Sequence, residues 1–203
     1  MPWGWNPSIR KYLLKRGVNE DKLPSPRLLA DYRSLSSRIQ AVEMTRRMTG
    51  RYPGYTCGEH TLMNNIEDCE RIVNTMHACL LKVPWSGSGK GLNWCLHGFT
   101  KPVSNWCERI LREQGCLTAE PIYNKVEDFA LEFYSDGCGG VRFAGYSMFS
   151  TNEHGAYTGN LLASDGQIEE IIARYLPLEK LERIREAPVS YTHLRAHETL
   201  ANL

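Results

Sequence analysis

Apolar residues recur at helical spacing through the first fifty positions of the chain. They follow one another at intervals of four and three residues, as on one face of an amphipathic helix, and they are Leu28, Tyr32, Leu35, Ile39 and Val42. Ser25 and Pro26 provide an N-cap and a first turn, and Gly50 provides a stop. The pattern predicts a helix over residues 26–50, within a helical lead-in that covers residues 1–58.

The pattern changes after a turn-rich connector at residues 51–58. A second helix is expected from Thr61, and its apolar face would carry Ile66, Cys69, Val73 and Met76. A short apolar strand at residues 78–82 comes next and leads into a glycine-rich loop at residues 84–91. The sequence therefore predicts the order helix, strand and loop.

The rest of the chain alternates between helices and strands. The expected helices cover residues 102–114, 167–175 and 177–186, and the expected strands cover residues 116–120, 128–134 and 141–149. The last two strands form a hairpin. The polar segment around His154, Tyr157 and Asn160 is expected to be a loop that could form a substrate wall. Helices mixed with strand hairpins predict an α+β fold.

Composition mainly excludes classes of protein. Of the 203 residues, 42% are hydrophobic and 23% are charged, so the chain is neither disordered nor fibrous. The 24 Lys and Arg residues nearly balance 23 Asp and Glu residues, which argues against a dedicated nucleic-acid or membrane-surface protein. No long apolar stretch or signal-peptide pattern is present. We therefore expect a cytoplasmic protein without a nucleic-acid or membrane partner.

The seven cysteines predict neither disulfides nor a metal site. Their number is odd, and no two have the Cys-x-x-Cys spacing of a zinc site. A chain of this length can also bury a core without covalent crosslinks. Reduced and mostly buried thiols are the expectation.

The end of the chain has a different character. Residues 189–203 resemble one reading frame of a sequencing adapter, and they follow Pro188 abruptly. We interpret residues 188–203 as a non-native tail, and the alternative is a frayed native one. On the first interpretation the natural protein continues past residue 187 into sequence that is absent here.

The glycine-rich loop is the clearest candidate for chemistry. It follows a strand that ends in Lys82, and its glycines would let backbone N–H groups converge on phosphate oxygens. The loop residues expected to contribute are Ser86, Gly87, Ser88, Gly89, Lys90 and Gly91. It is not a P-loop, because Gly91 stands where Ser or Thr would follow the lysine. The alternative is a flexible turn without a ligand.

Three segments carry a resemblance to a known family. Residues 80–92, 119–133 and 155–162 resemble an uncharacterised bacterial family with an ATP-grasp-like core. The resemblance covers most of residues 3–187 and implies that residues 59–187 form the larger part of that core. It also implies that this chain starts inside a preceding α/β region, so that it would be an internal fragment.

The resemblance implies an activity and a cofactor. ATP-grasp proteins hold a nucleotide between two α+β subdomains and generally activate a carboxylate as an acyl phosphate, which an amine or thiol attacks. In this chain Lys82 would reach the phosphates of ATP, the loop of residues 86–91 would close over them, and Glu120 would bind the adenine or ribose at the hinge. The expected partner is a small-molecule or peptide carboxylate.

Four further residues are weaker candidates. Lys125, Asp128 and Arg142 could contact substrate or phosphate, and Asn160 could line a substrate wall. Each has a structural alternative, because a strand-end cation can be solvated, Asp128 can pair with a nearby cation and Arg142 can face solvent. Lys82 and Glu120 have similar alternatives as strand-end residues.

The expected magnesium ligands are not found. The intact protein should use Mg²⁺, but no acidic residue followed by a Glu-x-Asn arrangement is present, and Glu132 and Asp136 are not spaced to replace it. We therefore expect this chain to be an ATP-binding fragment of a ligase-like protein. The fragment itself is expected to be inactive. Two alternatives stay open, a non-catalytic nucleotide- or peptide-binding module and an interaction domain whose glycine-rich loop is structural.

Overall fold

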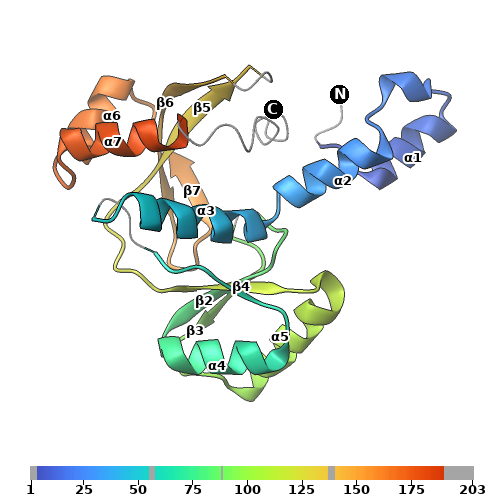
Figure 1. The fold of residues 1–203 in the computed structure, drawn as a ribbon, viewed down its shortest axis with the longest axis horizontal. Coiled ribbons are helices and arrows are strands. Elements are labelled where there is room, and N and C mark those ends of the chain that lie inside the picture. Colours follow the sequence, from blue (N-terminus) through green and yellow to red (C-terminus); the bar gives the residue numbers. More distant parts are fainter. Residues whose placement is uncertain (1–3, 55–57, 88, 137–139, 190–203) are drawn as a thin grey trace.

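The computed structural model describes residues 4–54, 58–87, 89–136 and 140–189. Its described residues form two antiparallel sheets with helices packed on each, which confirms the predicted α+β class (Figure 1). The tail at residues 190–203 and loop residue Ser88 lie outside the described residues. No helix among the described residues is long and apolar enough to cross a membrane.

The lead-in contains helices α1 (Pro7–Lys15), α2 (Pro26–Leu35) and α3 (Arg38–Arg51), with a 3-10 turn, η1 (Glu20–Lys22), after α1. The prediction of a single helix over residues 26–50 is wrong, because the helix is interrupted at Ser36 and Ser37. The Ser37 hydroxyl accepts a hydrogen bond from the Ile39 amide and starts a new helix there. Ser25 caps α2 as predicted.

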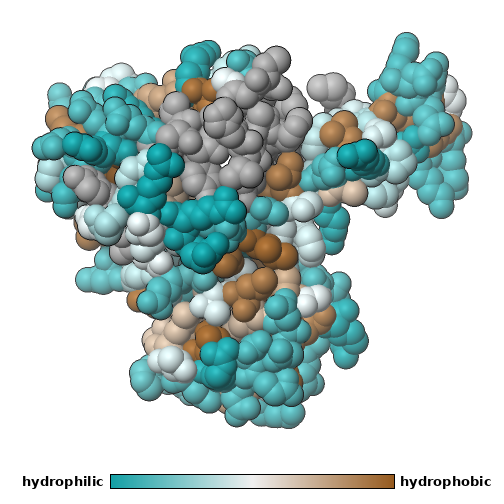
Figure 2. Space-filling view, viewed as in Figure 1, coloured by the Kyte–Doolittle hydropathy of each residue, from teal (hydrophilic) through white to brown (hydrophobic). Residues whose placement is uncertain are grey.

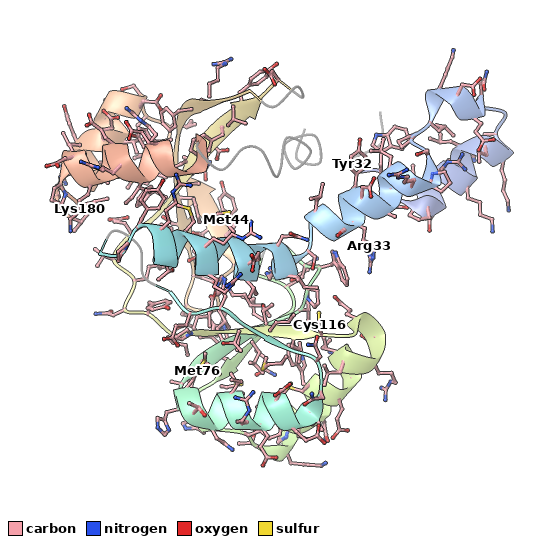
Figure 3. All side chains as sticks on the ribbon, viewed as in Figure 1. Tyr32, Arg33, Met44, Met76, Cys116 and Lys180 are labelled. Carbon is pink, nitrogen blue, oxygen red and sulfur yellow. The ribbon has the colours of Figure 1, made fainter. Side chains whose placement is uncertain are left out.

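Helices α1 and α2 project from the rest of the molecule as an arm (Figure 1). Arg10 holds the arm together, since its guanidinium pairs with Glu20 and donates to the Pro24 carbonyl oxygen at 2.9 Å. Arg33 lies at the end of α2 that joins α3, as Figure 3 shows. The arm therefore meets the body through the α2–α3 junction.

The first sheet has four strands in the order β1 (Thr61–Met63), β4 (Leu117–Pro121), β2 (Cys79–Lys82) and β3 (Leu92–Cys95). Helices α4 (Ile66–Met76) and α5 (Lys101–Gln114) pack on it. The helix expected from Thr61 starts instead at Ile66, because Asn65 caps it and residues 61–63 pair with β4. Strand β3 was not predicted.

The first sheet with α4 and α5 forms the first half of the molecule, and the second sheet with the helices that follow it forms the second half. The core of the first half contains four cysteine side chains that are at most 1% exposed. These are Cys69, Cys79, Cys95 and Cys107, which pack with Met63, Val73, Leu81 and Leu117. Cys116 is buried as well, and all five thiols are free. The expected burial is thus confirmed for these five thiols, and their reduced state stays a prediction, whereas Cys57 and Cys138 lie outside the described residues.

The second sheet has the order β5 (Asp128–Ser135), β6 (Val141–Thr151) and β7 (Tyr157–Asn160). The predicted hairpin of β5 and β6 is confirmed, and it carries a register shift after Glu132. The loop predicted around Tyr157 and Asn160 is wrong, because residues 157–160 pair with β6 as an edge strand.

Two C-terminal helices complete the second half, α6 (Asp165–Ile172) and α7 (Leu178–Val189). They bury Ile168, Ile172 and Leu181 against Tyr146 and Met148 of β6. The helices turn mainly hydrophilic residues outward, and hydrophobic residues reach the surface near the centre of the face drawn in Figure 2. Each sheet thus has a hydrophobic core of its own.

Candidate functional site

A cavity of about 740 Å³ lies between the two sheets. The first sheet contributes residues from β2, β3 and β4, and the second half contributes residues from β5, the β6–β7 turn and the end of α6. The cavity lining includes Leu80, Lys82, Leu92, Trp94, Glu120, Ile122, Lys125, Glu127, Asp128, Thr151, Glu153 and Gly155. Because both halves form its walls, a ligand here would contact both sheets.

An ion pair joins the first-sheet strands at this cavity. Lys82 ends β2, and its ammonium group pairs with Oε1 of Glu120 on the neighbouring strand β4. The other carboxylate oxygen, Oε2, contacts Nε2 of His60. Burial raises the pKa of Glu120, but the hydrogen bonds and charges of His60 and Lys82 outweigh it and hold that pKa below the ordinary value. Glu120 is therefore an ionised acceptor shared by two donors.

A second polar group lies on the opposite wall. The Lys125 ammonium donates to Asp128 Oδ2 and Thr151 Oγ1, each at 2.6 Å, and the Thr151 hydroxyl donates to Asp128 Oδ2 at 2.9 Å. These residues come from the link after β4, the start of β5 and the end of β6. Asp128 thus pairs with a cation, and the same contact holds Lys125 at the cavity.

The described residues of the glycine-rich loop lie beside the cavity and do not line it. The first residues of the loop, 84–86, form its root. Arg38 at the start of α3 fixes this root, since its guanidinium donates to the hydroxyl and carbonyl oxygens of Ser86 at 2.7 and 3.0 Å. Burial lowers the pKa of Arg38, and the charge of Glu120 opposes that shift. Gly91 packs tightly, because a Cβ atom there would lie 2.4 Å from Val83 Cγ2.

Trp85 adds a second anchor for the loop root. Its indole N–H donates to the Arg33 carbonyl oxygen at 2.8 Å, and the Arg33 guanidinium lies 4.0 Å from the ring centroid. Its backbone N–H donates to the side chain of Gln114 at 3.3 Å. The loop root is therefore held by both the α2–α3 junction and the end of α5.

The tip of the loop contacts the second sheet. A Cβ atom at Gly89 would meet Ala156, and one at Gly155 would lie 3.1 Å from Leu92 Cδ1. Lys90 is exposed, and its backbone N–H donates to the Gly87 carbonyl oxygen at 3.0 Å. The loop thus bridges the two halves at the edge of the cavity.

Two of the weaker candidates lie away from the cavity wall. The Arg142 guanidinium lies over the ring of Tyr134 at 4.7 Å from its centroid. The Asn160 side chain donates to the Ser147 hydroxyl at 3.3 Å. The structure thus brings Lys82, Glu120, Lys125 and Asp128 to the cavity wall, and it places Arg142 and Asn160 elsewhere.

The sequence did not indicate Arg38, His60 or Thr151. Arg38 was part of an amphipathic helix and His60 followed a turn-rich connector, so neither had a local signal of function. The described residues contain no group of three or more His, Cys, Asp or Glu side chains that could hold a metal ion. The expectation that this chain lacks magnesium ligands stays a prediction.

No protein-family model matches the sequence, and a search of curated proteins gave no match. The fold does match solved structures. The biotin carboxylase domain of 2-oxoglutarate carboxylase from Hydrogenobacter thermophilus, in complex with MgADP, ADP and bicarbonate, matches 68% of this chain and 32% of its own with a TM-score of 0.51 and 18% identity. The chain has an ATP-grasp-like fold. N5-carboxyaminoimidazole synthetase from Staphylococcus aureus, complexed with ADP, is a further match over 74% of this chain, with a TM-score of 0.48 and 13% identity.

The predicted ATP-grasp-like core is confirmed as a fold by the match to the biotin carboxylase domain. The chain spans only about a third of the length of these solved structures, 32% and 37%. Likeness at such low identity extends to the fold and not to the reaction.

Proposed function

We propose that the cavity between the two sheets binds ATP, and that this chain is the nucleotide-binding part of a carboxylate–amine ligase. The observation that carries the proposal is the Lys82–Glu120 ion pair in the cavity wall. It places a cation beside an ionised acceptor, and a nucleotide needs one group for its phosphates and the other for its hydroxyl or amino groups.

The size and lining of the cavity support a nucleotide. Its volume of about 740 Å³ lies in the range of small-molecule sites, roughly 300–1,000 Å³. Leu80, Leu92, Trp94 and Ile122 give one wall an apolar surface beside the ion pair. A flat base can pack against such a surface while the polar groups orient it.

Lys82 and Glu120 would have separate roles. The Lys82 ammonium carries three donors, so it can turn toward phosphate oxygens while it keeps a hydrogen bond to Glu120. Glu120 would accept from a ribose hydroxyl or the adenine amino group. The loop of residues 86–91 would supply backbone N–H donors to the phosphates when it bends toward the cavity, because its glycines permit that movement.

Magnesium is expected to enter with the nucleotide rather than to be held beforehand. The described residues contain no metal cluster, although Glu127, Asp128 and Glu153 add carboxylates to the wall. When bound, Mg²⁺ would offset the charge of the phosphates. We assign no protein-held magnesium site to this chain.

The proposed reaction is carboxylate activation in a protein that contains this chain. A carboxylate oxygen attacks the γ-phosphorus of ATP, ADP leaves, and an acyl phosphate forms. An amine then attacks the carbonyl carbon, inorganic phosphate leaves, and the nitrogen releases a proton. The substrate would be a small-molecule or peptide carboxylate in the cytoplasm, with Lys125 and Asp128 as its nearest candidate contacts and Arg142 and Asn160 as outlying ones. The chain alone is expected to bind ATP without turnover.

One observation favours a second function, an interaction domain with a structural loop. The Ser86 hydroxyl already accepts from Arg38, and Gly91 packs on Val83, so part of the loop has a purely structural explanation. In that case the loop would serve to join the two halves, and no nucleotide would bind.

Calorimetric titration with MgATP decides between these functions. We expect the chain to bind, and we expect Lys82→Gln to weaken binding by about tenfold or more, which is roughly 1.4 kcal/mol. Lys101→Gln is the matched control, because Lys101 is exposed at the start of α5 and outside the cavity lining. A cooperatively folded chain that binds no MgATP, or a Lys82→Gln variant with unchanged affinity, would overturn the proposal.

A further inference from the structure

His60 contacts Glu120 from outside the cavity. Its Nε2 atom contacts Oε2 of Glu120, while Oε1 of the same carboxylate pairs with Lys82 inside the cavity wall. His60 does not line that cavity. It lines a separate, smaller one of about 370 Å³, together with Arg46, Gly58 and Glu59. The imidazole and a bound nucleotide would therefore lie on opposite sides of one carboxylate.

The position of the imidazole is fixed at both nitrogens. Nδ1 lies 3.3 Å from the Thr45 hydroxyl on α3, and Nε2 lies against Glu120 on β4. The side chain of His60 is 26% exposed and that of Glu120 is 17% exposed, so bulk water screens the contact only in part. His60 is well placed to hold the carboxylate in one orientation.

We propose that His60 is a positioning residue that holds Glu120 toward Lys82 and makes nucleotide binding at the cavity depend on pH. The proposal rests on the proposed function, because it concerns the same cavity. When His60 is neutral, the group of His60, Glu120 and Lys82 has no net charge. When His60 gains a proton, the group has one positive charge, and Glu120 is shared between two cations. Lys82 is then freer to bind a phosphate anion.

The other charges around His60 act in both protonation states. Arg46 of α3 and Glu59 share the smaller cavity with it, and the charge of Arg38 on α3 interacts with Glu120. None of these side chains ordinarily changes its charge between pH 6 and pH 8, whereas a histidine ordinarily does. A difference in pH dependence between the chain and a variant that lacks this imidazole is therefore assigned to His60.

The test is the affinity for MgATP at pH 8 and pH 6 in the chain and in His60→Gln. The glutamine amide can still donate to Glu120 but cannot gain a proton. At pH 6 we expect the chain to bind MgATP roughly three- to tenfold more tightly than His60→Gln does, which is the effect of one partly screened unit charge. At pH 8 we expect the two proteins to bind MgATP with equal affinity. Protonation of ATP itself affects both proteins alike, so the difference between them is the readout.

Two controls separate the possible failures. Adenosine has no phosphate for Lys82 to bind, so its affinity should not show the His60-dependent increase at pH 6 that is expected for ATP. An equal effect on adenosine, or the same pH dependence in the chain and in His60→Gln, would overturn the role of His60 while leaving ATP binding intact. Absence of MgATP binding to the folded chain at both pH values would overturn the proposed function, and the role of His60 with it.

Discussion

Gly89 of the glycine-rich loop lies against the backbone of Ala156 in the β6–β7 turn. A Cβ atom at Gly89 would stand 2.8 Å from the Cα atom of Ala156, which is closer than such atoms approach in proteins. The residue also has a φ of +73°, which residues with side chains rarely adopt. The contact between the two halves at this point therefore depends on a residue without a side chain.

Replacing Gly89 with alanine should separate the loop from the β6–β7 turn. We expect Gly89→Ala to lower the free energy of unfolding by about 1–3 kcal/mol, because it combines an unfavourable φ with a backbone clash. Gly87→Ala is the matched control, since nothing lies within 4 Å of the position that its Cβ atom would take. The control should stay within about 0.5 kcal/mol of the parent chain. Urea denaturation of both variants measures the difference, and equal midpoints would contradict the prediction.

Arg38 should control the order of the loop root. Lysine in its place keeps the charge but cannot reproduce the forked contacts to Ser86. We expect Arg38→Lys to increase amide hydrogen exchange in residues 83–91 by about tenfold, the equivalent of roughly one charged hydrogen bond. Exchange measured by mass spectrometry tests this, with Arg27→Lys on the exposed surface of α2 as control. Unchanged protection in the loop would contradict a role of the Arg38 side chain in its order.

Glu120 should make stability depend on acid pH. Because its pKa is held below the ordinary value, its ionisation stabilises the fold above the pKa of an unfolded glutamate, about 4.3, and this stabilisation is lost as the pH falls. Between about pH 5 and pH 3 the free energy of unfolding should therefore fall more steeply in the chain than in Glu120→Gln. Glu153→Gln, at a side chain that is 85% exposed, should keep the steep dependence. Parallel curves for the chain and Glu120→Gln would exclude the carboxylate as the cause.

Lys125 should matter more for binding than for stability. Its side chain is 47% exposed, so the ion pair with Asp128 should contribute less than about 1 kcal/mol to folding. We expect Lys125→Met to change the free energy of unfolding by no more than that and to weaken MgATP binding about threefold or more, since a cavity cation is lost. The control is Lys22→Met in the distant arm. Normal affinity together with normal stability would remove Lys125 from the site.

The sequence predicted elements with strong periodicity and missed elements that depend on a partner. Strands β5 and β6 alternate clearly, and their hairpin was found. Strand β7 is short and mostly exposed, so only its pairing with β6 distinguishes it from a loop. The break before Arg38 was hidden because the apolar stripe continues across Ser36 and Ser37. Capping of a helix by a serine hydroxyl does not change the spacing of the apolar residues, so hydrophobic periodicity cannot reveal it.

The same limit applies to the candidate site. Lys82 and Glu120 could be proposed from the sequence because each ends a predicted strand. Their direct pairing needs the register of β2 on β4, which local pattern does not supply. Arg38 and His60 are 82 and 60 positions from Glu120 along the chain, so their contacts with this region arise only from tertiary packing.

The buried thiols make the two halves distinguishable in solution. All five described cysteines belong to the first half, and the described residues from Asp128 onward include none. Cys116, which Figure 3 labels, is 5% exposed, and burial raises the pKa of its thiol. Alkylation requires an accessible thiolate. The alkylation rate of each of these cysteines can be followed peptide by peptide. It would report how often the first half unfolds locally, because the described part of the second half contains no cysteine to be modified.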